Sequence, residues 1–226
     1  MPTLEVRRLG LMPYAEALEL QGLLVEQRRA GTIGDQLLLV EHPAVLTLGV
    51  RREGGRVHIL ASDAELAARQ IDVFETRRGG DVTYHGPGQI VGYPIIDLDP
   101  DRRDVHKYVR DLEDVLIRVA ADYGIHAGRV PGLTGVWVGD EKLAAIGVRI
   151  QRWVTSHGFA LNHTTDLSHF NLIVPCGISD KGVTSLAALG CTATRDAVEA
   201  RIVSHYGDVF GRVLQDTPVR RAGSAA

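Results

Sequence analysis

Cys176 has the sequence setting of a reactive nucleophile. It lies between Pro175 and Gly177, directly after the apolar run 172–174. Proline stiffens the approach, and glycine leaves the neighbouring peptide N–H free to face a bound oxygen. A thiolate here would attack a carbonyl carbon and hold an acyl group as a thioester. A cysteine buried as a small hydrophobe fits the local sequence equally well.

A nucleophilic cysteine needs a base or a cation beside it, and the candidates are Lys142, His85, His157 and His163. Lys142 enters an apolar run, where desolvation would lower its pKa and let it accept a proton. A solvated lysine at the start of a strand is the more common arrangement. A lone histidine at a strand entry, such as His157, more often has a structural role. The second cysteine, Cys191, has no comparable setting.

The run 77–94 is rich in glycine and alternates apolar residues on both sides of its centre. This pattern predicts a strand, a tight turn and a second strand, with His85 at the tip of a rigid hairpin. Such a loop would form the floor of a ligand pocket. Glycines that only serve the turns themselves explain the pattern at least as well.

The sequence lacks the motifs that are typical of metal sites, nucleotide-binding loops and serine hydrolases. The two cysteines are too far apart for a CxxC ligand pair, and HExxH, GxxxxGK[ST] and GxSxG do not occur. We therefore expect no metal and no nucleotide cofactor. The residues by themselves predict a cysteine-dependent acyl or group transfer.

Composition limits the class of protein. The chain has 226 residues, a formal net charge of −3 and 45% hydrophobic residues, which is typical of one globular domain over 1–226 with a frayed tail from about 215. The charge argues against a nucleic-acid partner. No apolar run is long enough for a bilayer, and the N-terminus lacks a signal-peptide core, so we expect a reduced, cytoplasmic protein without a membrane partner.

Hydrophobic periodicity predicts an α+β fold with a mixed, largely antiparallel sheet flanked by helices. Strands outnumber helices, and several strands adjoin through short turns. Helices are predicted at 13–30, 62–69 and 105–123, with a last one from about 198 to 213. Strands are predicted at 4–9, 37–40, 45–50, 71–76, 82–84, 90–96, 126–130, 135–138, 142–150 and 156–163.

Four ordered blocks resemble one known family. The run 78–89, RGGDVTYHGPGQ, followed by Gly92-Tyr93-Pro94, is similar to the signature of the octanoyltransferases of lipoate biosynthesis, also called lipoyl(octanoyl) transferases. The other blocks are Lys142 with 145–147, the run 157–162, and the run 175–178 around Cys176. The resemblance spans about residues 41 to 186.

This resemblance implies the fold of the biotin/lipoate protein ligase superfamily and an acyltransferase without cofactor. Octanoate would pass from octanoyl-acyl carrier protein to a lysine of lipoyl domains, in the E2 subunits of 2-oxoacid dehydrogenases and in the glycine cleavage H protein. Cys176 would be the acyl-thioester nucleophile, and Lys142 would lower its pKa and relay protons. The acyl pocket would be lined by Arg78, Gly79, Gly80, Asp81, Val82, Thr83, Tyr84, His85, Ala145, Ile146, Gly147, Gly158, Phe159 and Ala160.

Two other functions fit the same fold. An ATP-dependent lipoate or biotin ligase would activate a free acid, and a non-catalytic protein would bind the acyl carrier without turnover. The presence of both Cys176 and Lys142 favours the transferase. Because acyl carrier proteins are acidic, we expect Arg51, Arg52, Arg77 or Arg78 to help dock the donor.

Overall fold

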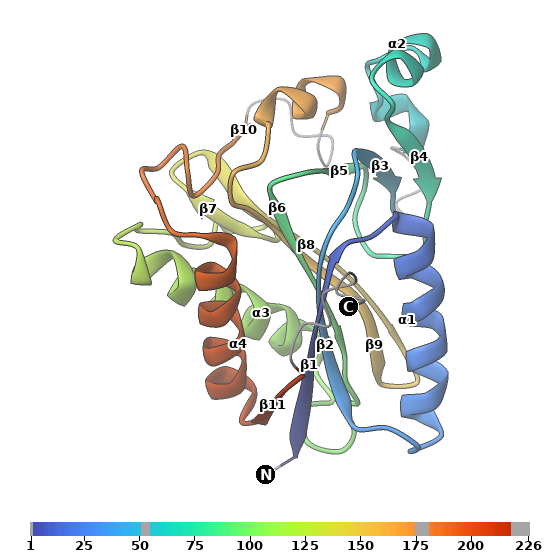
Figure 1. Cartoon of the computed structure of the whole chain (residues 1–226), viewed down its shortest axis with the longest axis vertical. Helices are drawn as coiled ribbons and strands as arrows, with labels where there is room; N and C mark the ends of the chain where they lie inside the picture. Colours follow the sequence, from blue (N-terminus) through green and yellow to red (C-terminus); the bar gives the residue numbers. More distant parts are fainter. Residues whose placement is uncertain (1, 51–54, 175–180, 218–226) are drawn as a thin grey trace, which may run out of the picture.

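The computed structural model describes residues 2–50, 55–174 and 181–217, and in this part of the chain an eight-stranded sheet is the central element (Figure 1). Strands β2, β6, β9 and β8 pair antiparallel in its middle, and parallel pairs join β1 to β2, β11 to β1 and β10 to β8. The fold class expected from the sequence is confirmed. The strands are β1 (Thr3–Leu11), β2 (Asp35–Glu41), β6 (Gln89–Ile95), β7 (Val136–Val138), β8 (Glu141–Gln151), β9 (Val154–Asn162), β10 (Gly182–Val183) and β11 (Val213–Thr217).

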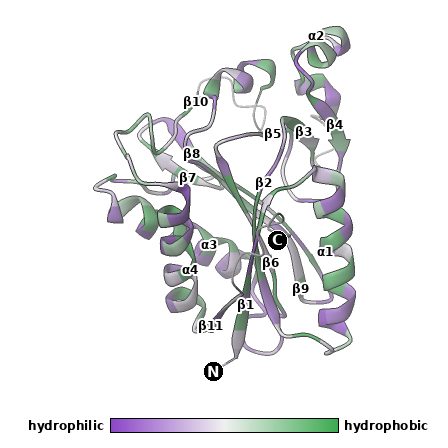
Figure 2. Cartoon of the chain, viewed as in Figure 1, coloured by the Kyte–Doolittle hydropathy of each residue, from purple (hydrophilic) through white to green (hydrophobic). Residues whose placement is uncertain are grey.

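Helices cover both faces of this sheet. Helix α1 (Tyr14–Arg29) lies on one face, and α3 (Val105–Asp122) and α4 (Arg195–Phe210) lie on the other (Figure 1). Both α1 and α3 alternate hydrophobic and hydrophilic residues along their length (Figure 2). In β2, Leu37 packs toward α3 and α4 while Leu38 packs toward α1, so this strand is buried on both faces.

A smaller sheet stands beside one end of the large one. It contains β3 (Val45–Leu48), β4 (Asp72–Glu75) and β5 (Thr83–His85), in the order β4-β3-β5. The short helix α2 (Asp63–Ala68) begins as predicted, because the Ser62 hydroxyl accepts a hydrogen bond from the Glu65 N–H at 3.2 Å. Two 3₁₀ turns complete this region, at Gly55–His58 and Leu167–Leu172.

The predicted hairpin around His85 is wrong. Strand β5 pairs with β3 of the small sheet, whereas β6 pairs with β2 and β9 of the large sheet. The turn at 86–88 therefore carries the chain from one sheet to the other. Gly88 has a φ of +81°, and a side chain there would also meet Thr164, so this crossing requires glycine.

Two further segments differ from the sequence predictions. Residues 126–130 do not form a strand, since Gly128 alone makes a bridge to Trp137 and the following Pro131 lacks an N–H. The last helix ends at Phe210, because Gly211 is left-handed with a φ of +61°. The chain then forms β11 parallel to β1, so the expected tail does not begin at 215.

Candidate active site

A cavity of about 390 Å³ lies where the glycine-rich segment 78–83 meets strands β6, β8 and β9. Its wall is largely apolar, with Val91, Val109, Leu133 and Ile146 among the lining residues. Helices contribute as well, through Tyr14 from α1 and Val105 from α3. Ligand sites typically combine such a wall with a few polar groups, and Lys142 and His85 are two of those here.

The lining contains all the pocket residues expected from the sequence except Tyr84. Side chains alternate along β5, so Thr83 and His85 face the cavity while Tyr84 points the other way. The Tyr84 ring packs in the cluster of the small sheet, and its hydroxyl is hydrogen-bonded to His169 Nδ1 at 2.8 Å.

Close backbone contacts explain two of the glycines. The Gly79 N–H donates to Val148 O at 2.9 Å, which fastens the glycine-rich segment to β8. A Cβ atom at Gly147 would lie 2.8 Å from Gly79 O, closer than real Cβ contacts allow. These glycines let two segments that are distant in the sequence meet, beyond serving their own turns.

Lys142 is buried at the cavity wall, with 9% of its surface exposed. Its strand β8 is paired on both sides here, with Trp137 of β7 and Val183 of β10. The Lys142 Nζ lies 4.8 Å from the centre of the Trp137 ring, within cation–π range. The alternative of a solvated lysine at a strand start is therefore wrong.

Cys176 lies outside the described residues, as do Arg51 and Arg52. In the sequence, Cys176 stands between Phe170 and Val183, which both line the cavity. Cys191 is a free, half-buried thiol that packs against the large core.

Arg78 is buried, and its guanidinium donates to the Thr47 carbonyl at 2.6 Å and to the Thr47 hydroxyl at 2.9 Å. It also donates to Gly79 O at 3.1 Å. The idea that Arg78 docks an acidic carrier is wrong, because its charge is committed inside the protein. Arg77 beside it is exposed, so the expectation that it helps to dock the acidic carrier stays a prediction.

Three buried histidines and two tyrosines pack together between α1 and the sheet. We call this group the histidine cluster; it consists of Tyr14, His42, His85, Tyr93 and His157. Burial, assisted by nearby arginines, lowers the pKa of His42 and of His157 to about 4. Burial, and then the neighbouring His42, lower the pKa of His85 to about 3. All three imidazoles are thus neutral at pH 7.

A row of hydrogen bonds connects His85 to the strand that carries Lys142. His85 Nδ1 and Gln89 Oε1 are 2.7 Å apart, and Gln89 Nε2 donates to Asn162 Oδ1 at 3.0 Å. Asn162 Nδ2 then donates to Thr184 O at 2.9 Å, and the Thr184 N–H donates to Lys142 O at 3.0 Å. Because Gln89 presents its oxygen to His85, the imidazole carries its proton on Nδ1 and offers Nε2 as an acceptor.

Sequence reasoning missed the wall formed by α3 and the segment before β7, with Val105, Val109, Leu133 and Thr134. It also missed Tyr14, which a helix far away in the sequence brings to the cavity. One signal was present: Glu113 interrupts the apolar stripe of α3, and it is completely buried. A carboxylate in such a stripe indicates a specific partner.

Among the described residues, no group of three or more His, Cys, Asp or Glu side chains is arranged so that it could hold a metal ion. The helices of this part of the chain are also too short or too polar to cross a membrane.

Comparison with known proteins places the chain in a family. Residues 13–207 match the model of the lipoyl protein ligase A/B catalytic domain, which covers most of the chain. The chain therefore belongs to this family.

Curated relatives show which activity within this family the chain has. The chain is 57% identical over 205 residues to an octanoyltransferase of Solibacter usitatus, with 91% of this chain and 92% of the relative covered. It is 56% identical to an octanoyltransferase of Acidobacterium capsulatum, with 92% and 90% covered. Within the family, the chain is an octanoyltransferase of lipoate biosynthesis. The resemblance seen in the sequence is confirmed, and the ligase and non-catalytic alternatives are not supported.

Solved structures confirm the predicted fold. A bipartite lipoate protein ligase from Thermoplasma acidophilum matches with a TM-score of 0.70 at 13% identity, covering 97% of this chain and 88% of that one. A lipoate-protein ligase A bound with ATP matches with a TM-score of 0.69 at 12% identity, covering 96% and 89%. At such identities the likeness concerns the fold alone.

Proposed function

We propose that the chain moves an octanoyl group from octanoyl-acyl carrier protein to a lysine of lipoyl domains, through a thioester on Cys176. The acceptors are lipoyl domains of the E2 subunits of 2-oxoacid dehydrogenases and the glycine cleavage H protein. The observation that carries this proposal is a buried Lys142 on the wall of a largely apolar cavity. Membership in the octanoyltransferases supports it.

In the first half-reaction, the Cys176 thiolate attacks the carbonyl carbon of the donor thioester. The bond between that carbon and the carrier sulfur breaks, and Lys142 passes the proton taken from Cys176 to the departing carrier thiolate. Backbone N–H groups beside glycine stabilise the tetrahedral oxyanion.

In the second half-reaction, the amine of the acceptor lysine attacks the enzyme thioester. The amide forms, the bond to Cys176 Sγ breaks, and the proton lost by the amine goes to Lys142. An amide is more stable than a thioester, so this step proceeds without ATP.

The cavity wall suits a linear acyl chain. Val82, Ile146 and Phe159 provide apolar surface, and Val82 and Phe159 are almost fully buried. Each methylene that leaves water contributes about 0.8 kcal/mol.

Intact-mass measurement tests the proposed route. After mixing with octanoyl-acyl carrier protein, we expect an octanoyl adduct on the wild type that disappears when a lipoyl domain is added. The Cys176→Ser variant should show no adduct, and Cys191→Ser serves as the matched control that keeps it. Modification of the lipoyl domain without any adduct, and only with ATP, would overturn the thioester route.

A further inference from the structure

Glu113 is a charged residue in a position that the helix pattern reserves for apolar side chains. It lies one turn after Val109 and one turn before Leu116 on α3, and its side chain is completely buried. A carboxylate in such a place is expensive unless it is paired and hydrogen-bonded. The groups that are hydrogen-bonded to the Glu113 carboxylate therefore show which part of the chain this residue holds in place.

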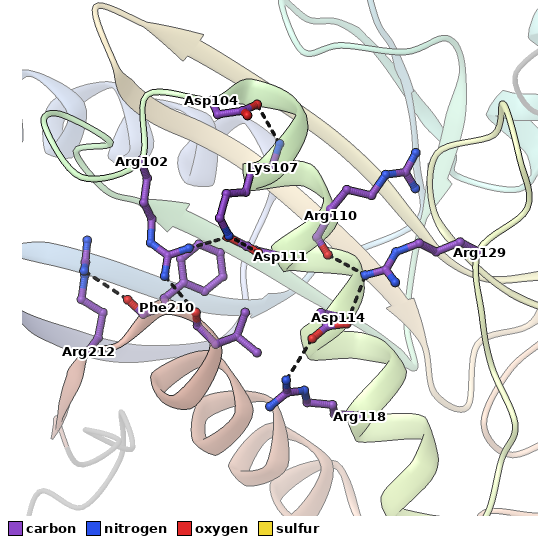
Figure 3. A network of polar contacts seen from close by, with 11 residues as sticks. Arg102, Asp104, Lys107, Arg110, Asp111, Asp114, Arg118, Arg129, Phe210 and Arg212 are labelled. Atoms are coloured by element: carbon purple, nitrogen blue, oxygen red, sulfur yellow. Dashed lines mark hydrogen bonds and ion pairs between the residues drawn. The ribbon is translucent and has the colours of Figure 1, made fainter.

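The Glu113 carboxylate binds both ends of one segment, residues 129–135. Its Oε2 accepts from Arg129 Nε at 2.8 Å and from Arg110 Nη1 at 2.6 Å, and its Oε1 accepts from the Gly135 N–H at 3.0 Å. Arg129 adds hydrogen bonds to Arg110 O at 2.9 Å and to Asp114 at 3.1 Å (Figure 3). The segment is thus fastened to α3 at its beginning and at its end.

This segment leads directly to Lys142. A Cβ atom at Gly135 would lie 3.6 Å from Lys142 Cε and 2.7 Å from Ala144 O, so the backbone passes immediately over the lysine stem. Leu133 and Thr134 of the same segment line the cavity.

Trp137 follows and completes the contact. It pairs with Lys142 across the strands and exchanges two backbone hydrogen bonds with Gly128, at 2.8 and 2.9 Å. Its ring lies under the Lys142 ammonium group. Trp137 follows Gly135, the end of the fastened segment, by two residues, and a Cβ atom at Gly135 would lie 3.6 Å from its ring nitrogen.

We propose that Glu113 is a positioning residue for Lys142, acting through the segment 129–135 and Trp137. Glu113 is not among the residues that line the cavity, and its carboxylate binds Arg110, Arg129 and the Gly135 N–H, so it acts on Lys142 through these neighbours. The importance of this placement for turnover rests on the proposed function of Lys142. The placement itself is a property of the folded chain and can be measured without turnover.

Tryptophan emission reports the placement. The chain has two tryptophans, so Trp153→Phe leaves Trp137 as the single emitter. In that background, Lys142→Met should change the emission of Trp137, because the ammonium group over the ring is lost. When Glu113→Leu is also present, Lys142→Met should leave the emission unchanged. An equal change with and without Glu113→Leu, or no change in either, would overturn the proposal.

Transfer kinetics provide the second measurement. Glu113→Leu places an apolar side chain of similar size in the stripe, and the partly exposed Arg110 and Arg129 side chains can turn to water, so the variant should be less stable but still unfold cooperatively. We expect its kcat/KM to fall by roughly a hundredfold, since a displacement of about 1 Å in a reacting group has that effect. Glu113→Gln retains an acceptor for Gly135 and should recover part of the loss. A value within threefold of wild type for Glu113→Leu would contradict the proposal.

Asp114→Asn is the matched control, because Asp114 also binds Arg129 but is only half-buried. Its kcat/KM should stay within about twofold, as is usual for an exposed ion pair. If the protein did not turn over octanoyl-acyl carrier protein at all, the emission experiment would still decide the placement, so the two failures are distinguishable.

Discussion

The Glu113 site on one face of the central sheet and the histidine cluster on the other bury ionisable groups in opposite ways. On the α3 face, the buried Glu113 carboxylate is surrounded by the guanidinium groups of Arg110 and Arg129. On the α1 face, the charges acting on His42 and His157 come from arginines, which repel an imidazolium. Burial disfavours the charged imidazolium of these histidines, and the nearby arginines add to that effect.

This difference gives the cavity two kinds of wall. Lys142 and the segment held by Glu113 form a wall that carries the ammonium group of Lys142, suited to proton transfer and to stabilising an anion. The histidine cluster forms a wall of neutral rings, which can accept hydrogen bonds without attracting water as strongly as ions do. The predictions below test this contrast.

The largest effect is expected from removing the cation. Lys142→Met should lower kcat/KM for octanoyl transfer by about 10²–10⁴-fold, the usual contribution of a positioned acid or base. Lys107→Met, which removes an exposed lysine of α3, is the control and should leave the rate unchanged. A Lys142→Met rate within threefold of wild type would show that the charged wall has no part in the chemistry.

The next effect concerns the apolar surface between the two walls. Ile146→Trp should shift selectivity from octanoyl toward shorter acyl chains by roughly tenfold or more, because the larger ring fills the cavity. Competition between donors of different length, followed by mass spectrometry of the acceptor, measures this. Ile150→Trp, in the same strand but outside the cavity lining, is the control. Unchanged selectivity in Ile146→Trp would remove Ile146 from the acyl pocket.

The neutral wall should make the protein sensitive to acid. His157 has a pKa of about 4 when folded and about 6.5 when unfolded, so between these values only the unfolded chain binds the proton. Its contribution to the free energy of unfolding then falls by about 1.4 kcal/mol per pH unit as the pH decreases from 6.5 to 4.

Urea denaturation of His157→Asn measures this contribution. Asparagine tolerates the positive φ of 54° at this position, and it does not titrate. The stability of the variant should therefore decrease less steeply than that of wild type between pH 6.5 and 4. Parallel curves would mean that His157 is not held neutral.

The smallest effect comes from giving the α1 face one opposite charge. Gln21 Oε1 accepts from the His157 N–H at 2.8 Å, so Gln21→Glu places a carboxylate beside this residue. The pKa of His157 should rise by about one unit, as an imidazolium gains a partner. Titration of the imidazole proton signals by NMR measures it, with His42 as the internal reference. A pKa that stays at about 4 would show that burial alone sets the charge.

Much of the fold could be predicted because it depends on local patterns. The helices predicted at 62–69 and 105–123 and the strand predicted at 37–40 follow from residue types and their spacing, and all three are present. A turn that carries the chain from one sheet to another cannot be predicted from such patterns. The residues of β5 and β6 do not indicate which strand each will pair with, so the predicted hairpin at His85 was wrong although both strands exist.

The candidate site also combines features that the sequence predicts with features that arise only on folding. By itself, the sequence determined the residue types that can do the chemistry, namely Cys176 and Lys142, and the glycine-rich segment that resembles a family signature. Tertiary structure alone decided that α1 and the segment 129–135 complete the cavity, that Arg78 is buried, and that the three histidines are neutral. The physical reason is that pKa values and cavity walls depend on neighbours from distant parts of the chain, and these neighbours come together only on folding.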